Sequence, residues 1–375
     1  MKLNDLFDVK LLEQHIANRF VGVQHHPSLP LRIFNYTQNA QFEGKLWGDG
    51  TIDFCRGLIV DDNDNVIARP FKKFHNLQTT NIPETWEENL PQTLPTVTKK
   101  YDGSLGVYWK YDGQFGIATR GSFTSPQALW ATKWLHERCP QGFVDNVLAP
   151  TTPLFEIIYP ENRIVVKYDF EGLVMIGLVD IQTGYEHNYR TLRDCAQYNG
   201  IRVAEYVALS VSHLKELNVE NEEGFVVSYW KHMEPPLKVK VKMADYVRLH
   251  KIVTGMNARS VWELLESGKG TAGFEHTPEH FQKWLAQWSE KLNEDFNELY
   301  MQALRIFNKR PNRAEWQDSR QYRAAFAEYV KFAALHVPEI HGFLFAMLDN
   351  KDPQPFIWKS IKPRGDDATF RTEGE

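Results

Sequence analysis

Residues 99–116 read KKYDGSLGVYWKYDGQFG, in which Lys-Tyr-Asp-Gly occurs twice, beginning at Lys100 and again at Lys110. In the second copy, Asp112-Gly113 separates two alternating runs of apolar and polar residues, GVYWKY and QFGIAT. Asp-Gly in that setting predicts a tight β-hairpin turn, because both central residues of such a turn need positive φ. Lys110 then lies beside an exposed turn. Lys100 instead ends the preceding strand, where a loop can direct it into a cleft.

Short alternating segments of this kind continue from about Phe34 to Lys251, and they are bounded by Gly, Asn, Asp and Pro. They predict strands and hairpins. Beyond Lys251 the pattern changes to helical periodicity, with a run that offers Thr277 as N-cap and Pro278 as the first helical residue. The apolar side chains of this run share one helical face: Phe281, Trp284, Leu285, Trp288, Leu292, Phe296, Leu299 and Ala303.

These patterns predict an α+β protein with two domains, since 375 residues exceed the usual size of a single core. We expect an N-terminal domain at residues 1–252 that is built on antiparallel β-sheets with flanking helices. An all-α domain is expected to follow at residues 253–375.

The composition is that of an ordinary globular protein, with 42% hydrophobic and 24% charged residues. A formal charge of −5 gives no global attraction to nucleic acid, so a nucleic-acid binder would need a local basic groove. The three cysteines form no CxxC pair and suggest neither a zinc site nor a disulfide framework. No signal peptide or membrane-spanning run is recognisable, which indicates a cytoplasmic protein without a membrane partner.

Distinctive segments surround the hairpin in a fixed order: Arg32–Tyr36 (RIFNY), Cys55–Gly57 (CRG), Ala68–Asn76 (ARPFKKFHN), Thr98–Ser104 (TKKYDGS), Arg120–Ala131 (RGSFTSPQALWA), Asn162–Tyr168 (NRIVVKY), Glu223–Val227 (EGFVV) and Lys240–His250 (KVKMADYVRLH). As an ordered set they resemble the bacteriophage T4 RNA ligase 1 family, within the covalent nucleotidyltransferase superfamily. The resemblance covers most of residues 1–251. It departs from the family at His75, where the family often has phenylalanine.

The resemblance implies that Lys100 is a catalytic nucleophile. The family's basic residue after the motif matches Arg120, which stands twenty positions beyond Lys100 but only ten beyond Lys110. Lys100 would attack ATP to form lysyl-AMP, with Mg²⁺ or Mn²⁺ as the metal cofactor. The AMP would pass to a 5′-phosphate RNA end, and a 3′-hydroxyl end would then displace it. The expected partner is therefore RNA with these two ends.

The chemistry explains why basic residues should surround the nucleophile. A lysine attacks phosphorus only when it is neutral, so we expect Arg56, Lys240, Lys242 and a divalent metal to lower its pKa. The same cations would stabilise charge on the α-phosphate. Lys240 and Lys242 share one face of a predicted strand. An isolated pair of this kind would more often be two solvated lysines, and it is the preceding Glu223-Gly224 strand that favours a site.

By the same resemblance, Glu156 contacts the nucleoside and Glu223 helps to organise the metal, with Glu156 a second candidate metal ligand. Structural ion pairing is the alternative for either glutamate, and Tyr36 could equally belong to the core. The complete set expected to contact the nucleotide is Tyr36, Arg56, Lys73, Lys100, Asp102, Gly103, Arg120, Glu156, Glu223, Lys240 and Lys242.

Other functions remain open from the sequence. A DNA ligase or a capping nucleotidyltransferase usually continues into a small β-barrel, whereas this chain continues into helices. An inactive ligase-like RNA-binding protein is the alternative outside enzymes, and the intact Lys100, Glu223 and Lys240 argue against it. The helical domain of the resembled family is linked to substrate choice such as broken tRNA. We expect the protein to be a monomer.

Overall fold

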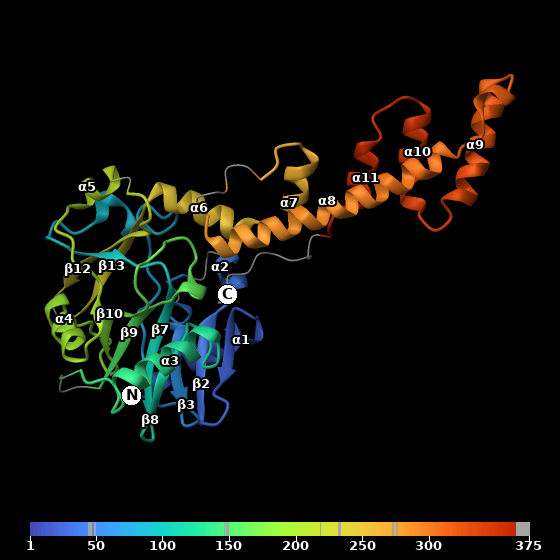
Figure 1. Ribbon diagram of the computed structural model, residues 1–375. Coiled ribbons are helices and arrows are strands. Elements are labelled where there is room, and N and C mark those ends of the chain that lie inside the picture. The colour runs from blue at the N-terminus through green and yellow to red at the C-terminus, as the bar shows by residue number, and fades with distance from the viewer. Residues whose placement is uncertain are drawn as a thin grey trace. The chain divides into compact units, whose positions relative to one another are not determined.

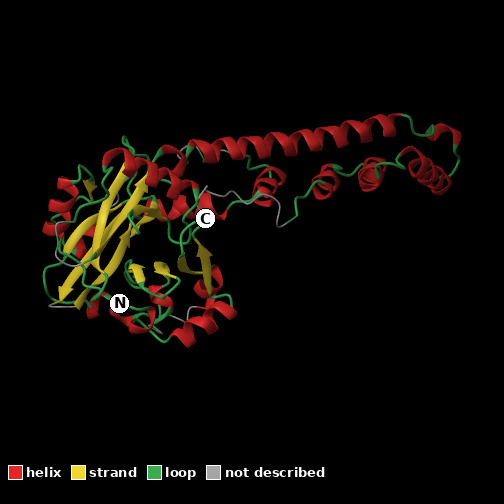
Figure 2. Cartoon of the chain, turned by 90° about the horizontal axis from the view of Figure 1, so that it is seen from below, coloured by secondary structure: helices red, strands yellow, loops and turns green. Residues whose placement is uncertain are grey.

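The computed structural model describes the whole chain except residues 44–46, 49, 146, 148–149, 218, 232–233, 272–273, 275–276 and 365–375. It divides into two compact units, Met1–His250 and a second unit from Lys251 onward (Figure 1). The division falls inside helix α6 (Ala244–Gly255), two residues before the predicted boundary. Strands occupy the first unit, and the described secondary structure of the second unit is helical (Figure 2). The predicted α+β class with a helical C-terminal part is therefore confirmed.

The first sheet is antiparallel and has the strand order β1-β2-β3-β4. Its strands are β1 (Val21–His25), β2 (Leu31–Tyr36), β3 (Arg56–Asp61) and β4 (Val66–Ala68). One face packs on α1 (Val9–Ala17), and α2 (Gln38–Glu43) follows β2. Ile33 and Ile59 on the other face pack against Leu105 and Val107 of the second sheet.

The second sheet has the order β11-β10-β9-β7-β8, with only the short β11 parallel to its neighbour. Its strands are β7 (Ser104–Tyr111), β8 (Gln114–Ala118), β9 (Thr151–Ile158), β10 (Gly172–Asp180) and β11 (Arg202–Val203). Helices α3 (Pro126–Arg138) and α4 (Tyr189–Tyr198) cover one face of this sheet (Figure 1). The predicted hairpin between β7 and β8 is confirmed. Asp112 has φ 47° and Gly113 has φ 74°, and Lys110 is exposed beside them.

The third sheet has the order β5-β13-β12-β6 and is antiparallel except for the β5–β13 pair. Its strands are β5 (His75–Asn76), β6 (Thr96–Lys100), β12 (Gly224–Lys231) and β13 (Glu234–Lys242), and α5 (Val211–Glu216) packs nearby. One face is apolar and builds a core around Val97, Phe225, Val227 and Val239. Alternate residues of the same strands point to the opposite face, which is where Lys100 lies.

The second unit consists of α7 (Ala258–Glu266), α8 (Glu279–Asn308), α9 (Ser319–Ala333), α10 (His341–Leu348) and α11 (Gln354–Ser360). The predicted apolar face of α8 is correct, because its residues enter two clusters centred on Phe281 and Phe343. The predicted cap was one residue too early. Pro278 is the N-cap and the helix begins at Glu279, while the hydroxyl of Thr277 donates to the carbonyl of Phe274.

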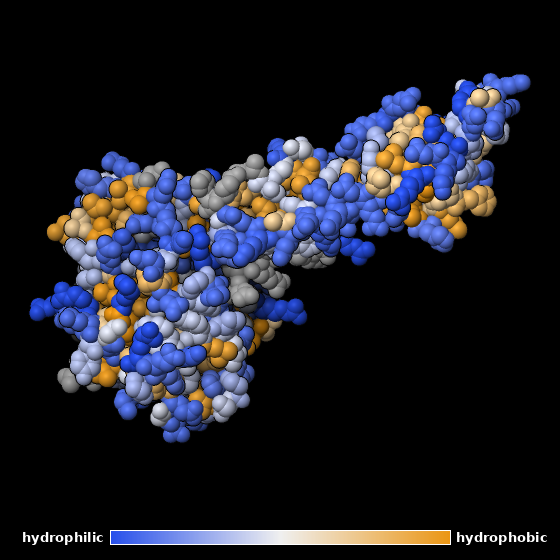
Figure 3. All heavy atoms as spheres, viewed as in Figure 1, coloured by the Kyte–Doolittle hydropathy of each residue, from blue (hydrophilic) through white to orange (hydrophobic). Residues whose placement is uncertain are grey.

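Hydrophilic residues cover much of the visible face of α8, and hydrophobic residues gather over α9 and α10 (Figure 3). Short 3₁₀ turns link the elements of both units: Leu3–Asp5, Ile52–Phe54, Pro83–Thr85, Glu87–Asn89, Pro160–Asn162, Arg313–Glu315 and Pro338–Ile340. Within the described residues, no helix has the length and apolar character that crossing a membrane requires.

Candidate active site

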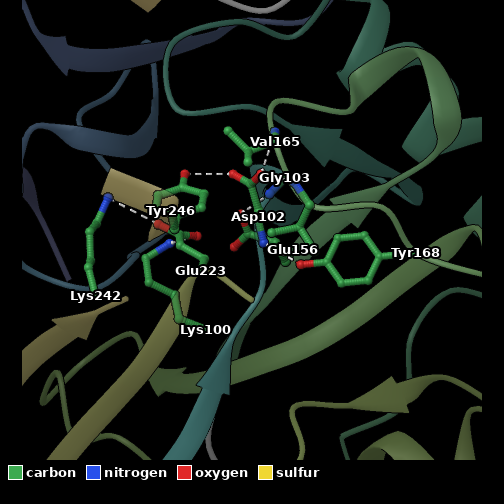
Figure 4. A network of polar contacts seen from close by, with 10 residues as sticks. Lys100, Asp102, Gly103, Glu156, Val165, Tyr168, Glu223, Lys242 and Tyr246 are labelled. Carbon is green, nitrogen blue, oxygen red and sulfur yellow. Dashed lines mark hydrogen bonds and ion pairs between the residues drawn. The ribbon is translucent and has the colours of Figure 1, made fainter. Parts of the chain in front are cut away.

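The centre of the site is an ion-paired triad at the edge of the third sheet. Strand register places Gly224 opposite both Lys100 and Lys242, so that the preceding residue, Glu223, stands between the two lysines. Lys100 Nζ donates to Glu223 Oε2 at 2.6 Å, and Lys242 Nζ lies 3.1 Å from Glu223 Oε1 (Figure 4). Glu223 is buried, and its burial is tolerable because both carboxylate oxygens are paired.

Gly224 makes this arrangement possible. Its φ is +143°, and an added Cβ would lie 2.1 Å from the carbonyl oxygen of Val241. No other residue combines this conformation with this close approach of the neighbouring strand. The glycine of the EGFVV segment therefore sets the position of the Glu223 carboxylate.

The charge state of Lys100 differs from the sequence prediction. Burial alone would lower the pKa of Lys100, but the negative charges of Glu223, Glu156 and Asp102 raise it overall. The expected lowering by surrounding cations is thus wrong for the nucleotide-free protein, in which Lys100 is an ammonium. The residue with the lowered pKa is instead Lys240, where burial and the charges of Arg56, Lys100 and Lys242 bring the pKa well below its ordinary value.

Glu156 approaches Lys100 from the second sheet. It lies on β9, and the backbone N–H of Gly103 donates to its Oε1 at 3.2 Å. A Cβ at Gly103 would lie 2.4 Å from the carbonyl oxygen of Ile157, so glycine is required for this close contact. Burial raises the pKa of Glu156 to about 7, although Lys100 and Arg56 oppose this rise.

Asp102 organises the loop that follows Lys100. Its Oδ2 accepts hydrogen bonds from the backbone N–H groups of Val165 (2.7 Å) and Val166 (2.9 Å), and its Oδ1 accepts one from the hydroxyl of Tyr246 at 2.8 Å (Figure 4). The N–H of Asp102 donates to the Tyr168 hydroxyl at 2.7 Å. Asp102 is buried and its carboxylate is fully engaged, so these contacts hold the loop in place.

A second basic cluster forms around Tyr36, which is buried. Lys73 Nζ lies 4.5 Å from the centre of the Tyr36 ring and 3.3 Å from that of Trp47, and the Arg120 guanidinium lies 5.4 Å from Tyr36. Burial alone would raise the pKa of Tyr36, but Arg56, Lys73 and Arg120 lower it overall. The sequence motifs RIFNY, CRG, ARPFKKFHN and RGSFTSPQALWA therefore converge at one place.

His75 extends this cluster toward the third sheet. Its ring lies edge-on to Trp47, with the ring centres 5.9 Å apart. Burial, with the charges of Lys73 and Lys240, lowers the pKa of His75 to about 4. The imidazole is therefore neutral at physiological pH, as the aromatic residue common at this position in the resembled family would be.

A cavity of about 610 Å³ opens between the second and third sheets. Six of the predicted site residues line it: Arg56, Lys100, Gly103, Arg120, Glu156 and Lys240. The other five predicted residues, all of them described, do not line it: Tyr36, Lys73, Asp102, Glu223 and Lys242. Lys73 lines a second, smaller cavity. Lys110 is remote from the cavity, at the β7–β8 turn. The volume is that of a site for a nucleotide-sized ligand.

Residues 54–247, more than half of the chain, match the model of a protein family described as RNA ligase, of the T4 RNA ligase 1 type. The chain belongs to this RNA ligase family. A putative RNA ligase of Thermovibrio ammonificans is 30% identical over 253 residues, which cover 64% of this chain and 63% of that protein.

A putative bifunctional polynucleotide kinase/RNA ligase of Autographa californica nuclear polyhedrosis virus is 29% identical over 260 residues, covering 64% of this chain and 36% of that protein. This RNA ligase family member thus spans less than two thirds of the length of either relative. Among solved structures, an archaeal ATP-dependent RNA ligase is 13% identical over 88% of this chain and 78% of that one, with a TM-score of 0.47.

Sequence reasoning missed several polar residues of this family member's site. Asn162 lines the cavity and accepts a hydrogen bond from the Ser104 hydroxyl at 3.0 Å. Lys238 also lines it and forms an ion pair with Glu186. Lys238 could have been found, because it continues the alternation of Lys240 and Lys242 by one step. Nothing in the sequence around Glu186 pointed to the pair.

Proposed function

We propose that this protein is an ATP-dependent RNA ligase that joins 5′-phosphate and 3′-hydroxyl RNA ends through a lysyl-AMP intermediate at Lys100. The observation that carries the proposal is the position of Lys100. Its side chain is 20% exposed, lines a nucleotide-sized cavity and is held by Glu223. Basic side chains from Arg56, Arg120 and Lys240 line the same cavity, and such groups stabilise charge on transferring phosphates.

In the first step, Lys100 Nζ would form a bond to the α-phosphorus of ATP while the bond to the bridging oxygen of the β-phosphate breaks. Pyrophosphate leaves with the electron pair of that bond. Because Lys100 is an ammonium in the nucleotide-free protein, its proton must depart before the attack. Glu223 Oε2 accepts a hydrogen bond from Nζ. Burial alone would raise the pKa of Glu223, but Lys100 and Lys242 lower it overall, so this carboxylate keeps the proton on Nζ. The proton would therefore leave to solvent, to which the Lys100 side chain is 20% exposed.

In the second step, an oxygen of the RNA 5′-phosphate would attack the phosphorus of lysyl-AMP, which breaks the N–P bond and returns the amine to Lys100. In the third step, the 3′-hydroxyl of the other RNA end would attack the 5′-phosphate, and AMP would leave. Lys240 supports both steps, because it lines the same cavity as Lys100 and can stabilise an oxyanion when it is protonated.

The residues suit a divalent cation that is held partly by protein carboxylates and partly by the phosphates of ATP. Among the described residues, no group of three or more His, Cys, Asp and Glu side chains could hold a metal ion alone. Mg²⁺ is typically held by one or two carboxylates together with substrate phosphates. Glu156 suits this role because its Oε2 accepts no hydrogen bond from the described residues, and Glu223 is the second candidate. Mg²⁺ or Mn²⁺ there would neutralise phosphate charge and compete with Lys100 for the carboxylates.

RNA repair, including repair of broken tRNA, is the role we propose for this activity, with the helical unit contributing to the choice of RNA. Family membership supports the substrate class. The test is a gel assay with single-stranded RNA that carries a 5′-phosphate and a 3′-hydroxyl, a cleaved tRNA anticodon loop, and nicked duplex DNA, each with ATP and Mg²⁺. Sealing of RNA is expected. Sealing of the DNA nick alone would contradict the proposal.

A further inference from the structure

The cavity floor is a regular array of side chains in three rows. Pairing across β6, β12 and β13 places alternate residues of these strands side by side, and they share one face of the sheet. Starting at the nucleophile, the rows are Lys100/Gly224/Lys242, then Thr98/Val226/Lys240, then Thr96/Ser228/Lys238. All members of the third row line the cavity.

The third row lies at the distance of a nucleobase from the nucleophile. Thr96 precedes Lys100 by four residues, which in a strand corresponds to about 13 Å. An extended nucleoside monophosphate reaches a similar distance from its phosphorus to the far edge of its base. With its phosphorus at Lys100, such a nucleotide would cover the second row and present its base edge to the third.

The third row ends in a buried ion pair that the proposed chemistry does not use. Lys238 Nζ donates to Glu186 Oε2, and the two side chains are only 8% and 10% exposed. Glu186 belongs to the segment after β10, where it bridges to Val179, so the pair joins the second sheet to the third. The Lys238 ammonium also lies 3.5 Å from the centre of the Phe71 ring.

The pair keeps unused hydrogen-bonding capacity toward the cavity. Glu186 Oε1 accepts no hydrogen bond from the described residues, and the Lys238 ammonium has three donors, of which Glu186 takes one. Next to the pair, the buried Nε2 of His187 has no hydrogen-bond partner within the described structure. Buried polar groups are normally paired, so the unpaired Nε2 of His187, beside the second carboxylate oxygen of Glu186, points to a polar ligand group.

Apolar side chains flank this polar end of the cavity. Ile176 of the second sheet, Val226 of the third sheet, and Phe71 and Phe74 of the segment between β4 and β5 line it. A mostly apolar slot with a few convergent polar groups at one end is the usual form of a small-molecule site. A flat aromatic base fits such a slot, and the polar end would then read its edge.

We propose that Glu186 and Lys238 recognise the base of the nucleotide and select adenine over guanine. This inference rests on the proposed nucleotide chemistry at Lys100. The adenine edge offers an amino donor at position 6 beside ring-nitrogen acceptors, which complements a carboxylate acceptor beside an ammonium donor. Guanine presents an oxygen at position 6, which would face the unpaired oxygen of Glu186 without a proton between them.

The test compares ATP with GTP and with inosine triphosphate, which also carries an oxygen at position 6. Covalent adducts are measured with each α-labelled nucleotide and Mg²⁺, and affinities are measured in parallel by calorimetry with Lys100→Ala, which cannot react. The variants are Glu186→Gln and the isosteric pair Glu186→Gln with Lys238→Met. A matched control is Glu87→Gln, which breaks the exposed Lys215–Glu87 ion pair (2.6 Å).

The wild-type protein is expected to prefer ATP, and Glu186→Gln to reduce the ATP-to-inosine-triphosphate ratio by about tenfold or more, because the amide can donate to an oxygen at position 6. Glu87→Gln is expected to leave this ratio unchanged. An unchanged ratio in both Glu186 variants, with only a lower melting temperature, would mean that the pair merely joins the two sheets and would overturn the inference. Absence of any adduct together with a normal base preference in calorimetry would instead count against the proposed ligase chemistry alone.

Discussion

Lys100 Nζ donates a hydrogen bond of 2.6 Å to Glu223 Oε2, and this contact helps to keep Lys100 in its charged form. The proposed chemistry needs a neutral amine at Lys100, but the free protein holds it as an ammonium, because the nearby carboxylates outweigh the effect of burial. The ion pair orients Nζ toward the cavity before any nucleotide arrives. Activation of Lys100 then requires that the effect of the carboxylates on its pKa be weakened, so that the amine can lose its proton.

Glu223→Gln should lower the pKa of Lys100, because it removes the negative charge nearest to Nζ. In nucleotide-free protein, the pH dependence of Lys100 acetylation by acetic anhydride, followed by mass spectrometry, is expected to shift to lower pH. Lys110, which is exposed at the hairpin turn, serves as an internal reference whose profile stays the same. A Lys100 profile that moves to higher pH would contradict the assigned role of Glu223.

Gly224→Ala should be much more destabilising than Gly113→Ala, although both glycines have positive φ. At Gly113 nothing lies within 4 Å of an added Cβ, so only backbone strain of about 1–2 kcal/mol is expected. At Gly224 the added atom also meets the Val241 carbonyl, and a loss of about 3 kcal/mol or more is expected. Denaturant unfolding measures both free energies. Equal losses of unfolding free energy in the two variants would show that β13 does not pass as close to Gly224 as the structure indicates.

His75→Phe should reduce the acid sensitivity of the fold. The pKa of His75 is lowered from about 6.5 to about 4, so the unfolded chain binds a proton below pH 6.5 that the folded protein resists. Its contribution to stability is present above pH 6.5 and is lost as the pH falls through 4. The wild type is expected to lose on the order of 1 kcal/mol more than the variant between pH 7 and pH 4, after allowing for partial exposure. Parallel losses in urea unfolding at the two pH values would refute this.

Asp102→Asn should destabilise the loop after Lys100 more than Tyr246→Phe does. The asparagine oxygen can still accept from the N–H groups of Val165 and Val166, but these bonds lose the strength that the negative charge gives them. Its NH₂ group also replaces the oxygen that accepts from the Tyr246 hydroxyl, and together these changes cost about 1–3 kcal/mol. Tyr246→Phe removes one hydrogen bond, a loss of about 1 kcal/mol. Unfolding free energies of the two variants and the double variant give their coupling. Strict additivity would be inconsistent with a direct bond between these side chains.

Local patterns sufficed to predict several elements. The Asp112-Gly113 hairpin follows from the conformational demands of two adjacent residues, and the apolar face of α8 follows from one periodicity. The start of α8 was misplaced because Thr277 and Pro278 both suit a helix start. Which of them caps the helix depends on the Phe274 carbonyl that the Thr277 hydroxyl binds instead.

Long-range contacts limited the prediction of the site. Lys238 and Glu186 are 52 residues apart in the chain, and their pairing arises only when the second and third sheets face each other. The direction of the pKa shift of Lys100 was predicted wrongly for the same reason. The sequence identifies the cations and the carboxylates near Lys100, but the balance between their charges depends on distances that only the folded chain defines.

The central claim is that Lys100 is the residue that carries AMP. Incubation of the protein with ATP and Mg²⁺, followed by proteolysis and mass spectrometry, locates the adduct directly. The account predicts an AMP modification on Lys100 that disappears in Lys100→Ala and persists in Lys110→Ala. An adduct that persists in Lys100→Ala, or one that maps to Lys110, would contradict it.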